Sequence, residues 1–154
     1  MNKVLISYFS ASGVTKGVAE KVANAIKGDL FEIEPVKKYS SEDLDWTNKQ
    51  SRSSIEMNEN IKPEILNRVP NLEEYDTICL AFPIWWYKEP TIIDKFLEEN
   101  DMSNKNIFVF VTSGSSSIDS TYKSLTNNFP NLNFVSGKRF TGNESDEDYI
   151  NWIK

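Results

Sequence analysis

Five short apolar segments recur along the chain, and stretches with helical periodicity separate most of them. We expect strands at about residues 3–9, 29–34, 76–82, 106–112 and 132–137. Continuous apolar runs of this length are typical of parallel strands that are buried on both faces of a sheet. Strands that alternate with helices form βαβ units, whose strands are parallel. The alternation therefore predicts an α/β fold with a doubly wound, five-stranded parallel sheet and helices on both faces.

Between the predicted strands, apolar residues recur every three or four positions, as expected of helices that pack one face on a sheet. These residues are Val14, Val18, Val22 and Ile26; Ile92, Ile93, Phe96 and Leu97; Ile118, Tyr122, Leu125 and Phe129; and Tyr149, Ile150 and Ile153. Three of the helices begin with a Ser/Thr-x-x-acid pattern, which is typical of a capping box. The pairs are Thr91 with Asp94, Ser116 with Asp119, and Ser145 with Asp148.

The segment between Pro35 and Pro63 does not fit this alternation. It is long, polar and poorly periodic, and it includes the run SSEDLDWTNKQSRSSIEMNEN. We expect an excursion from the sheet with a short helix near Pro63–Arg68, and we assign no role to it. Because 154 residues suffice for one ordinary hydrophobic core, we expect residues 1–154 to form a single domain.

Composition excludes several classes of protein. A hydrophobic content of 39% with 26% charged residues is that of a globular protein, and no run approaches the roughly 18 apolar residues that a membrane span needs. The apolar run near the N-terminus is too short for a signal peptide, so we expect a cytoplasmic location. A formal net charge of −6 argues against a nucleic-acid partner.

Residue counts also limit the chemistry. The chain has no histidine, which removes histidine-based catalytic triads and the commonest zinc ligand. Its one cysteine, Cys79, lies inside the apolar run TICLAF, so we expect a buried hydrophobic residue rather than a reactive thiol. We predict neither a metal site nor a catalytic residue.

The loop after the first predicted strand combines hydroxyl groups with a glycine. A strand-to-helix turn presents free backbone N–H groups and the positive end of the helix dipole, which favour an anion. Hydrogen bonds to a charged group contribute about 1.5–3 kcal/mol each, so several can hold a phosphate without a cationic side chain. We predict that this loop binds a monophosphate through Ser10, Ala11, Ser12, Gly13, Val14 and Thr15.

Other ligands fit this loop less well. The spacing of the nucleoside triphosphate pattern, G-x-x-x-x-G-K-[ST], is absent. In the dinucleotide pattern, G-x-G-x-x-G, Ala11 stands where the first glycine would be, although Glu32 and Glu34 lie about 20 residues further on, as a ribose-binding acid would. A dinucleotide site and a hydroxyl-rich helix cap without a ligand both stay open.

Aromatic residues follow the third predicted strand. Trp85, Trp86 and Tyr87 are consecutive and too bulky to turn inward together, so at least one ring should face outward. Such a ring can bury about 150–250 Å², enough for a stacking platform under a flat ligand. Packing of the rings over the rim of the sheet is the alternative. The predicted ring-binding residues are Pro83, Ile84, Trp85, Trp86 and Tyr87.

The loop after the fourth predicted strand is small and polar. Small residues allow close backbone approach, so Thr112, Ser113, Gly114 and Ser115 can contact the edge of a heterocycle. Ligands of open parallel sheets bind at the carboxyl ends of the strands, where all three loops lie. Together the loops describe a ligand with a monophosphate at one end and a flat ring, stacked on aromatic side chains, at the other. That ligand is FMN.

On these motifs the chain resembles the flavodoxin family from Val4 to Trp152. The run from Ser10 to Thr15 is similar to the family's phosphate loop, Pro83 to Tyr87 to its first flavin-ring loop, and Thr112 to Ser115 to its second. The resemblance implies the strand order 2-1-3-4-5, with noncovalent FMN at the switch between the first and third strands. It also implies a carrier that passes electrons between redox partner proteins, and we expect a monomer or weak homodimer.

Two departures from the family pattern affect how we expect this chain to bind FMN and to stabilise its reduced form. Val14 stands where many members have asparagine, so we expect backbone alone to replace one side-chain contact to the phosphate. No glycine lies between Pro83 and Pro90, and a non-glycine residue with positive φ costs roughly 1–2 kcal/mol. In flavodoxins that stabilise one-electron-reduced flavin, a peptide near the flavin is understood to flip, and glycine eases this flip. We therefore expect this chain to stabilise one-electron-reduced flavin only weakly.

Three other functions share this scaffold. An FMN-dependent NAD(P)H:quinone-type oxidoreductase is the main alternative, since two-electron chemistry needs no such flip. Steady-state oxidation of NADH or NADPH would separate it from a carrier. A phosphate-receiver domain needs acids where this chain has Ser10 and Pro83, so it is disfavoured. A flavin-binding regulatory or scaffold protein stays open.

Overall fold

Strands and helices alternate along the chain as the sequence predicts. The computed structural model describes residues 3–113 and 117–153. The elements are β1 (Val4–Tyr8), α1 (Val14–Ile26), β2 (Asp29–Glu32), α2 (Arg52–Glu59), β3 (Thr77–Pro83), α3 (Thr91–Glu99), β4 (Asn106–Thr112), α4 (Asp119–Asn128), β5 (Asn133–Arg139) and α5 (Asp146–Ile153). A 3₁₀ turn, η1 (Leu72–Glu74), precedes β3.

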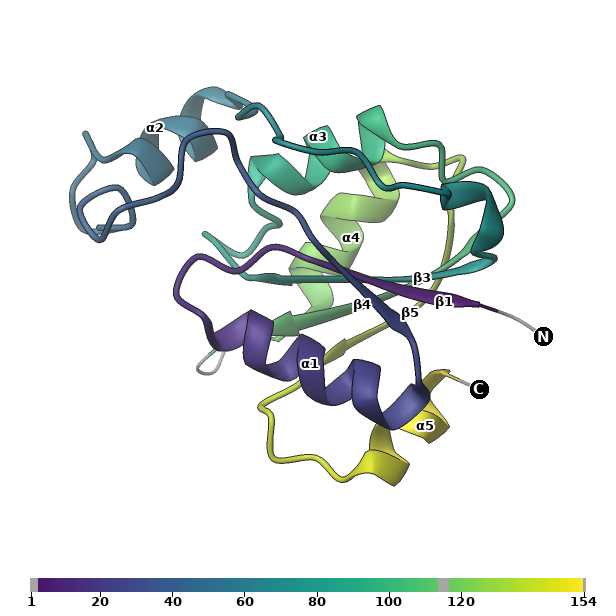
Figure 1. Ribbon diagram of the computed structural model, residues 1–154. Coiled ribbons are helices and arrows are strands. Elements are labelled where there is room, and N and C mark those ends of the chain that lie inside the picture. The colour runs from purple at the N-terminus through teal and green to yellow at the C-terminus, as the bar shows by residue number, and fades with distance from the viewer. Residues whose placement is uncertain (1–2, 114–116, 154) are drawn as a thin grey trace.

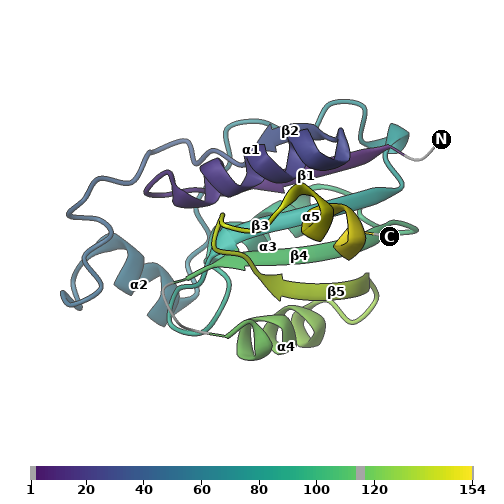
Figure 2. The ribbon, with the colours of Figure 1, turned by 90° about the horizontal axis from the view of Figure 1, so that it is seen from below.

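The strands form one parallel sheet with the order β2-β1-β3-β4-β5. This order confirms the predicted doubly wound architecture. α1 and α5 lie against one face of the sheet, and α3 and α4 lie against the other (Figure 1, Figure 2). The order reverses at β1, whose neighbours are β2 and β3. The loops that follow β1 and β3 therefore part at one edge of the sheet, where ligands of such folds bind.

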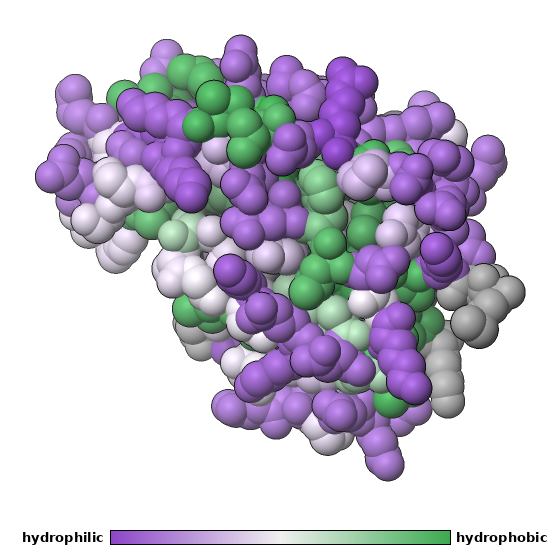
Figure 3. All heavy atoms as spheres, viewed as in Figure 1, coloured by the Kyte–Doolittle hydropathy of each residue, from purple (hydrophilic) through white to green (hydrophobic). Residues whose placement is uncertain are grey.

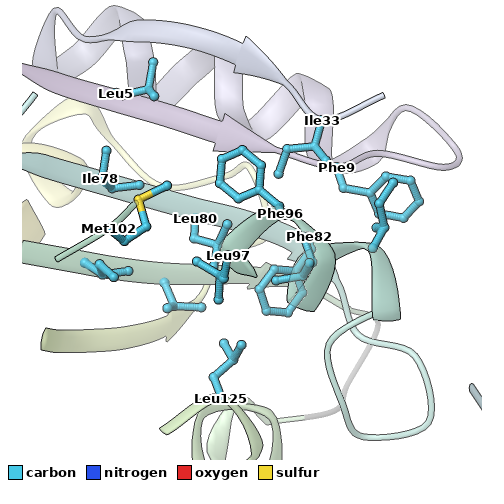
Figure 4. Close-up of a cluster of buried hydrophobic side chains, with 14 of the residues drawn as sticks. Leu5, Phe9, Ile33, Ile78, Leu80, Phe82, Phe96, Leu97, Met102 and Leu125 are labelled. Carbon is cyan, nitrogen blue, oxygen red and sulfur yellow. The ribbon is translucent and has the colours of Figure 1, made fainter. Parts of the chain in front are cut away.

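The central strands have continuous apolar sequences because both of their faces are buried, and β3 is an example. Ile78, Leu80 and Phe82 belong to the core beneath α3 and α4, whereas Cys79 and Ala81 belong to the core beneath α1 and α5, and all are fully buried. Successive side chains of a strand point to opposite faces, so a strand covered on both sides is apolar at every position. Figure 4 shows the first of these two cores, where the side chains of α3 close over the strands.

The excursion after β2 leaves the sheet and returns beside its own start. Pro35 and Ile65 pair in an antiparallel bridge that closes it. The predicted helix near Pro63–Arg68 is wrong, because this stretch forms no helix and supplies one side of that bridge. The helix of the excursion is α2 instead, capped by Ser51, whose side chain accepts from the N–H of Ser54. α2 shows little apolar periodicity, so its pattern does not reveal it.

Two of the predicted helix starts fall on described residues. Ser145 and Asp148 form the expected capping box at α5, since each backbone N–H donates to the other side chain, at 3.0 and 3.2 Å. The prediction for Thr91 is wrong, because its hydroxyl donates away from the helix to the carbonyl of Ile61 at 2.7 Å. Ser116 lies outside the described residues.

The surface is polar over most of the face shown in Figure 3, with hydrophobic patches between the polar side chains. Trp46, in the excursion, and Tyr87, after β3, have the largest exposed fractions among the large hydrophobic side chains described, 72% and 68%. In the described part of the chain, no helix has the length and apolar character of a membrane span.

Candidate functional site

The loop after β1 ends at a glycine that begins α1. Gly13 occupies the cap position of α1 with a φ of 94°, a left-handed conformation that favours glycine. Its N–H donates to the hydroxyl of Ser10 at 3.0 Å, which folds the loop back on itself. Ser12, Gly13 and Val14 are exposed, and the first turn of α1 carries no acidic residue. The loop therefore exposes the positive end of the helix dipole without a competing carboxylate.

Thr15 makes a contact that the sequence did not reveal. Its side chain is buried, and its hydroxyl lies 2.7 Å from the hydroxyl of Thr112. The hydrogen bond ties the first turn of α1 to the carboxyl end of β4. Thr15 therefore holds the loop after β1 against the carboxyl end of β4, whereas Ser12 is exposed.

A tight turn follows β3. Trp85 and Lys88 exchange two backbone hydrogen bonds of 3.0 Å, and the residues between them, Trp86 and Tyr87, have φ values of 50° and 64°. Two successive positive φ values make a type I′ turn, which normally takes glycine, asparagine or aspartate. Each non-glycine residue held this way costs roughly 1–2 kcal/mol. Positive φ is thus reached here without the glycine that the family pattern provides.

Contacts from α4 and from the end of β4 hold this strained turn in place. Thr121 of α4 donates its hydroxyl to the carbonyl of Tyr87 at 3.1 Å, and the N–H of Ile84 donates to the carbonyl of Thr112 at 3.3 Å. Trp86 remains 41% exposed, which confirms the prediction that at least one ring of this loop faces outward. Strained backbone persists where its surroundings over-determine it, and it clusters at functional sites.

Trp85, in contrast, packs inward on an aromatic cluster. Its ring meets Phe9 and Tyr39 edge-to-face, with ring centroids 5.6 and 5.4 Å away. The guanidinium of Arg52 lies 3.8 Å from the ring centroid of Tyr39, and the Tyr39 hydroxyl donates to the buried carboxylate of Glu56. Burial and this carboxylate raise the pKa of Tyr39. Through Tyr39, α2 is therefore connected to the loop after β3.

A cavity of about 460 Å³ brings together residues from all three predicted loops. The residues that line it and that the sequence analysis predicted to bind FMN are Ser12, Val14, Pro83, Ile84, Trp85, Thr112 and Ser113. Small-molecule sites typically measure roughly 300–1,000 Å³. Phe140 and Thr141, which follow β5, complete the lining and were missed by the sequence analysis. Their position could have been predicted, because the fifth strand of a parallel sheet ends at the same edge as the other four.

Other predicted residues line neighbouring cavities. Ser10 and Ala11 contribute to a smaller cavity of about 150 Å³ beside the end of β2. Trp86 and Tyr87 line a cavity of about 360 Å³ that faces the excursion. The structure thus divides the predicted ring-binding residues between two adjoining cavities, with Ile84 and Trp85 in the walls of both.

Arg139 supplies a cation that the sequence analysis missed. It ends β5, and its guanidinium donates to the carbonyl of Ser113 at 3.1 and 3.2 Å and to the hydroxyl of the same residue at 3.1 Å. Because Ser113 lines the 460 Å³ cavity, Arg139 brings positive charge to its edge. Gly114 and Ser115, also predicted to contact the ring, lie outside the described residues.

Two buried carboxyl groups follow the turn after β3 in the sequence. Glu89 and Asp94 are 3% and 9% exposed, and one oxygen of each has no hydrogen-bond partner among the described residues. The amide of Asn128 donates to the other oxygen of Glu89 at 3.4 Å. Burial, together with the neighbouring Glu89 carboxyl, raises the pKa of Asp94 to about 9. Two adjoining buried carboxyls resist ionising together, so the pair holds a proton at neutral pH.

Cys79 lies in the core, as predicted, and burial raises the pKa of its thiol. Within residues 3–113 and 117–153, no three Cys, Asp or Glu side chains are grouped so that they could hold a metal ion.

Known proteins resemble this chain over nearly its whole length. The family model for flavodoxin matches residues 3–154. A candidate flavoprotein from Bacteroides uniformis is 44% identical, with a TM-score of 0.92 over 99% of this chain and 97% of that one. A second, from Bacteroides eggerthii, is 39% identical, with a TM-score of 0.95 over 99% and 96%.

A more distant structure contains a ligand. The flavoprotein from Lactobacillus acidophilus, solved in complex with FMN, is 26% identical to this chain, with a TM-score of 0.80 over the full length of both. The comparison with curated proteins found no match.

Proposed function

Because the chain belongs to the flavodoxin family, we propose that residues 1–154 form a single domain that binds FMN noncovalently and carries electrons between redox partner proteins. FMN supplies the electron-carrying chemistry when bound. The protein supplies binding, orientation and exclusion of water. The FMN complex of the Lactobacillus acidophilus flavoprotein supports the choice of cofactor.

The observation that carries this proposal is the 460 Å³ cavity at the carboxyl ends of the strands. One side of it, at Ser12 and Val14, is the exposed start of α1, where backbone N–H groups would hold the phosphate. The glycine at the cap fits this role, because its positive φ turns the loop over the helix end. Several N–H and hydroxyl donors can bind a phosphate dianion without a lysine or arginine.

The opposite side of the cavity suits the flavin ring. Ile84 and Trp85 offer an apolar and aromatic surface, and Thr112 and Ser113 offer polar atoms at the other wall. Arg139, bound to Ser113, would place positive charge near this polar edge. Such charge favours the anionic form of a reduced ring.

Exposure of the turn after β3 favours a protein partner. Trp86 and Tyr87 are 41% and 68% exposed, directly beside the residues that would hold the ring. A carrier must bring the edge of its cofactor to the surface, and exposed aromatic residues are common anchors of protein interfaces. The formal net charge of −6 favours partners with a basic surface.

Ligand titration tests the proposal directly. The purified protein should show the absorbance of oxidised flavin or gain it with FMN, and it should bind FMN at least roughly 100-fold more tightly than riboflavin, which lacks the phosphate. NADPH should be oxidised only very slowly in the absence of a reductase. A colourless protein that binds neither compound would contradict the proposal, and rapid NADPH oxidation would favour the oxidoreductase alternative.

A further inference from the structure

The loop between β5 and α5 forms part of the wall of the 460 Å³ cavity, through Phe140 and Thr141. Phe140 is 1% exposed, and its N–H donates to the carbonyl of Val111 in β4 at 2.9 Å. Its ring packs on Tyr149 of α5, with the ring centroids 5.0 Å apart. The sheet and α5 therefore fix Phe140. Thr141 is exposed and lies beyond the end of β5, so other contacts must hold it at the cavity.

One carboxylate accepts hydrogen bonds from this loop and from α5. The N–H of Thr141 donates to the two oxygens of Glu144 at 2.9 and 3.3 Å, and the Thr141 hydroxyl donates at 3.0 Å. The N–H of Gly142 donates at 2.9 Å, and the Tyr149 hydroxyl donates at 3.0 Å. Although burial opposes ionisation, hydrogen bonds from backbone N–H groups and from Tyr149 lower the pKa of Glu144 to about 2. The carboxylate is thus ionised at neutral pH, and hydrogen bonds to an ionised acceptor are the stronger kind.

α1 also holds this loop. The ammonium group of Lys21 donates to the carbonyl of Gly142 at 2.7 Å, and a Cβ at Gly142 would lie 3.4 Å from the side chain of Val18. Val14, Val18 and Lys21 are spaced by four and three residues, so they share one face of α1. Val14 lies in the cavity wall together with Thr141. The loop, which runs from β5 across the sheet toward α1 in Figure 2, therefore reaches the end of α1 that is proposed to bind the phosphate.

The hydroxyl of Thr141 is engaged within the loop. It donates to Glu144, and it accepts from the N–H of Asn143 at 3.2 Å. Thr141 would therefore contact a ligand by packing rather than by donating a hydrogen bond. A packed wall at this end of the cavity would exclude water from the phosphate. Hydrogen bonds are stronger where water is excluded, so the wall would strengthen those between the start of α1 and the phosphate.

We propose that Glu144 is a positioning residue of the FMN site, which holds Thr141 beside the start of α1 so that the loop after β5 closes the phosphate end of the cavity. Glu144 acts through Thr141 and Gly142 and not through its charge, which would repel a phosphate. The inference rests on the proposed function and deepens it, because it adds a fourth loop to the three that the sequence predicted.

Titration of the purified protein with FMN and with riboflavin, followed by flavin fluorescence, tests the proposal. Glu144→Ala should weaken FMN binding about tenfold, because the charge-assisted hydrogen bonds that hold the loop are lost. Riboflavin has no phosphate, so its binding should weaken by at most about twofold. Removal of a negative charge near a phosphate would by itself strengthen FMN binding. The sign of the change therefore separates the position of the loop from the charge of Glu144.

Two further variants separate position from charge and from stability. Glu144→Gln removes the same charge as Glu144→Ala but keeps one acceptor oxygen, so it should weaken FMN binding less. Asp148→Ala is the matched control, because it also removes one negative charge close to this loop. Asp148 accepts from the N–H of Ser145 at 3.0 Å and belongs to the capping box of α5. Asp148→Ala should lower Tm without reducing the preference for FMN over riboflavin.

Amide hydrogen exchange, measured by NMR, tests the loop in the absence of FMN. Exchange at Thr141 and Gly142 should be about tenfold faster in Glu144→Ala than in the unmodified protein, because both N–H groups lose their acceptor. Exchange at Phe140 should not change, because its N–H donates to Val111 instead. Phe140 is therefore an internal control in the same spectrum.

Several results would overturn the inference. Unchanged or tighter FMN binding in Glu144→Ala would show that the carboxylate acts as a charge. Equal losses for FMN and riboflavin would assign Glu144 a purely structural role, and so would an equal loss of preference in Asp148→Ala. Unchanged exchange at Thr141 and Gly142 would show that other contacts hold the loop. Each of these results would leave the proposed function intact, whereas an unmodified protein that binds no FMN would refute both.

Discussion

Gly13 determines the backbone conformation of the loop after β1, which we propose binds the phosphate. It combines a φ of 94° with a place at the exposed start of α1. No atom outside its own chain neighbours lies within 4 Å of the position that a Cβ would take. Space is therefore not the reason for glycine here. The reason is the left-handed backbone, which any other residue adopts at a cost.

Gly13→Ala should lower the free energy of unfolding by about 1 kcal/mol and weaken FMN binding, because alanine resists a positive φ. Gly17→Ala is a matched control. Gly17 also has open space around its Cβ position, but it lies inside α1 without positive φ, so alanine should stabilise the helix by up to about 1 kcal/mol. Urea denaturation measures both variants. Effects of the same sign would contradict this account of the loop.

At the scale of elements, α2 depends on its contacts more than on its own pattern. Arg52 and Glu56 pair along the helix at 2.9 Å, and both also contact Tyr39 from the start of the excursion. Tyr39 in turn packs on Trp85. These contacts position the excursion, and with it Trp46 and Ser53, against the turn after β3.

Tyr39→Phe should lower the free energy of unfolding by about 1–2 kcal/mol, because the buried carboxylate of Glu56 loses a donor while the ring contacts remain. Tyr39→Ala removes the ring as well and should cost about 3–5 kcal/mol. Denaturation measurements give both values. Equal losses in the two variants would show that the aromatic cluster contributes nothing to stability.

The carboxyl pair of Glu89 and Asp94 makes stability depend on pH. The pKa of Asp94 is raised from 3.8 to about 9 in the folded protein, so the folded state retains a proton that the unfolded chain has lost. The free energy of unfolding should therefore fall as pH rises from about 4 to about 9, by at most about 1.4 kcal/mol per pH unit. Urea denaturation at pH 5, 7 and 8.5 measures the slope.

Asp94→Asn should flatten this slope and raise stability at pH 8.5, because an amide replaces the protonated carboxyl without titrating. Asp101→Asn is the control, since Asp101 is exposed and its pKa is lowered by hydrogen bonds from Ser103. It should leave the fall between pH 5 and 8.5 intact. A stability that rises with pH in the unmodified protein would refute the shared proton.

At the scale of the whole molecule, the sheet organises both stability and binding. Its two faces are closed by separate cores, and the carboxyl ends of β1, β3, β4 and β5 all contribute to the 460 Å³ cavity. A ligand in that cavity would contact elements from both halves of the chain. Binding should therefore stabilise the fold as one unit, since the cavity does not exist in the unfolded chain.

FMN at 100 times its Kd should raise the free energy of unfolding by about 2.7 kcal/mol, which corresponds to a rise in Tm of roughly 5–10 °C. Riboflavin at the same concentration should shift Tm much less, because it lacks the phosphate. Thermal denaturation followed by circular dichroism measures both. Equal shifts would mean that the start of α1 contributes nothing to binding.

The sequence by itself determined the class of the fold, the order of its elements and the three loops that matter. These properties are local: a strand buried on both faces must be apolar throughout, and the left-handed backbone at position 13 favours glycine. The helix of the excursion and the cap at Thr91 were misread for the same reason, since their structure depends on contacts outside the local pattern, with Tyr39 and Ile61.

Only the tertiary structure decided which groups meet. The bond between Thr15 and Thr112 and the cation at Arg139 each join different elements, and no spacing in the sequence encodes them. The raised pKa of Asp94 depends on its burial beside Glu89, which the sequence does not reveal either. The division of the aromatic loop between two cavities was equally hidden. Burial and proximity set these properties, and both arise only when the chain has folded.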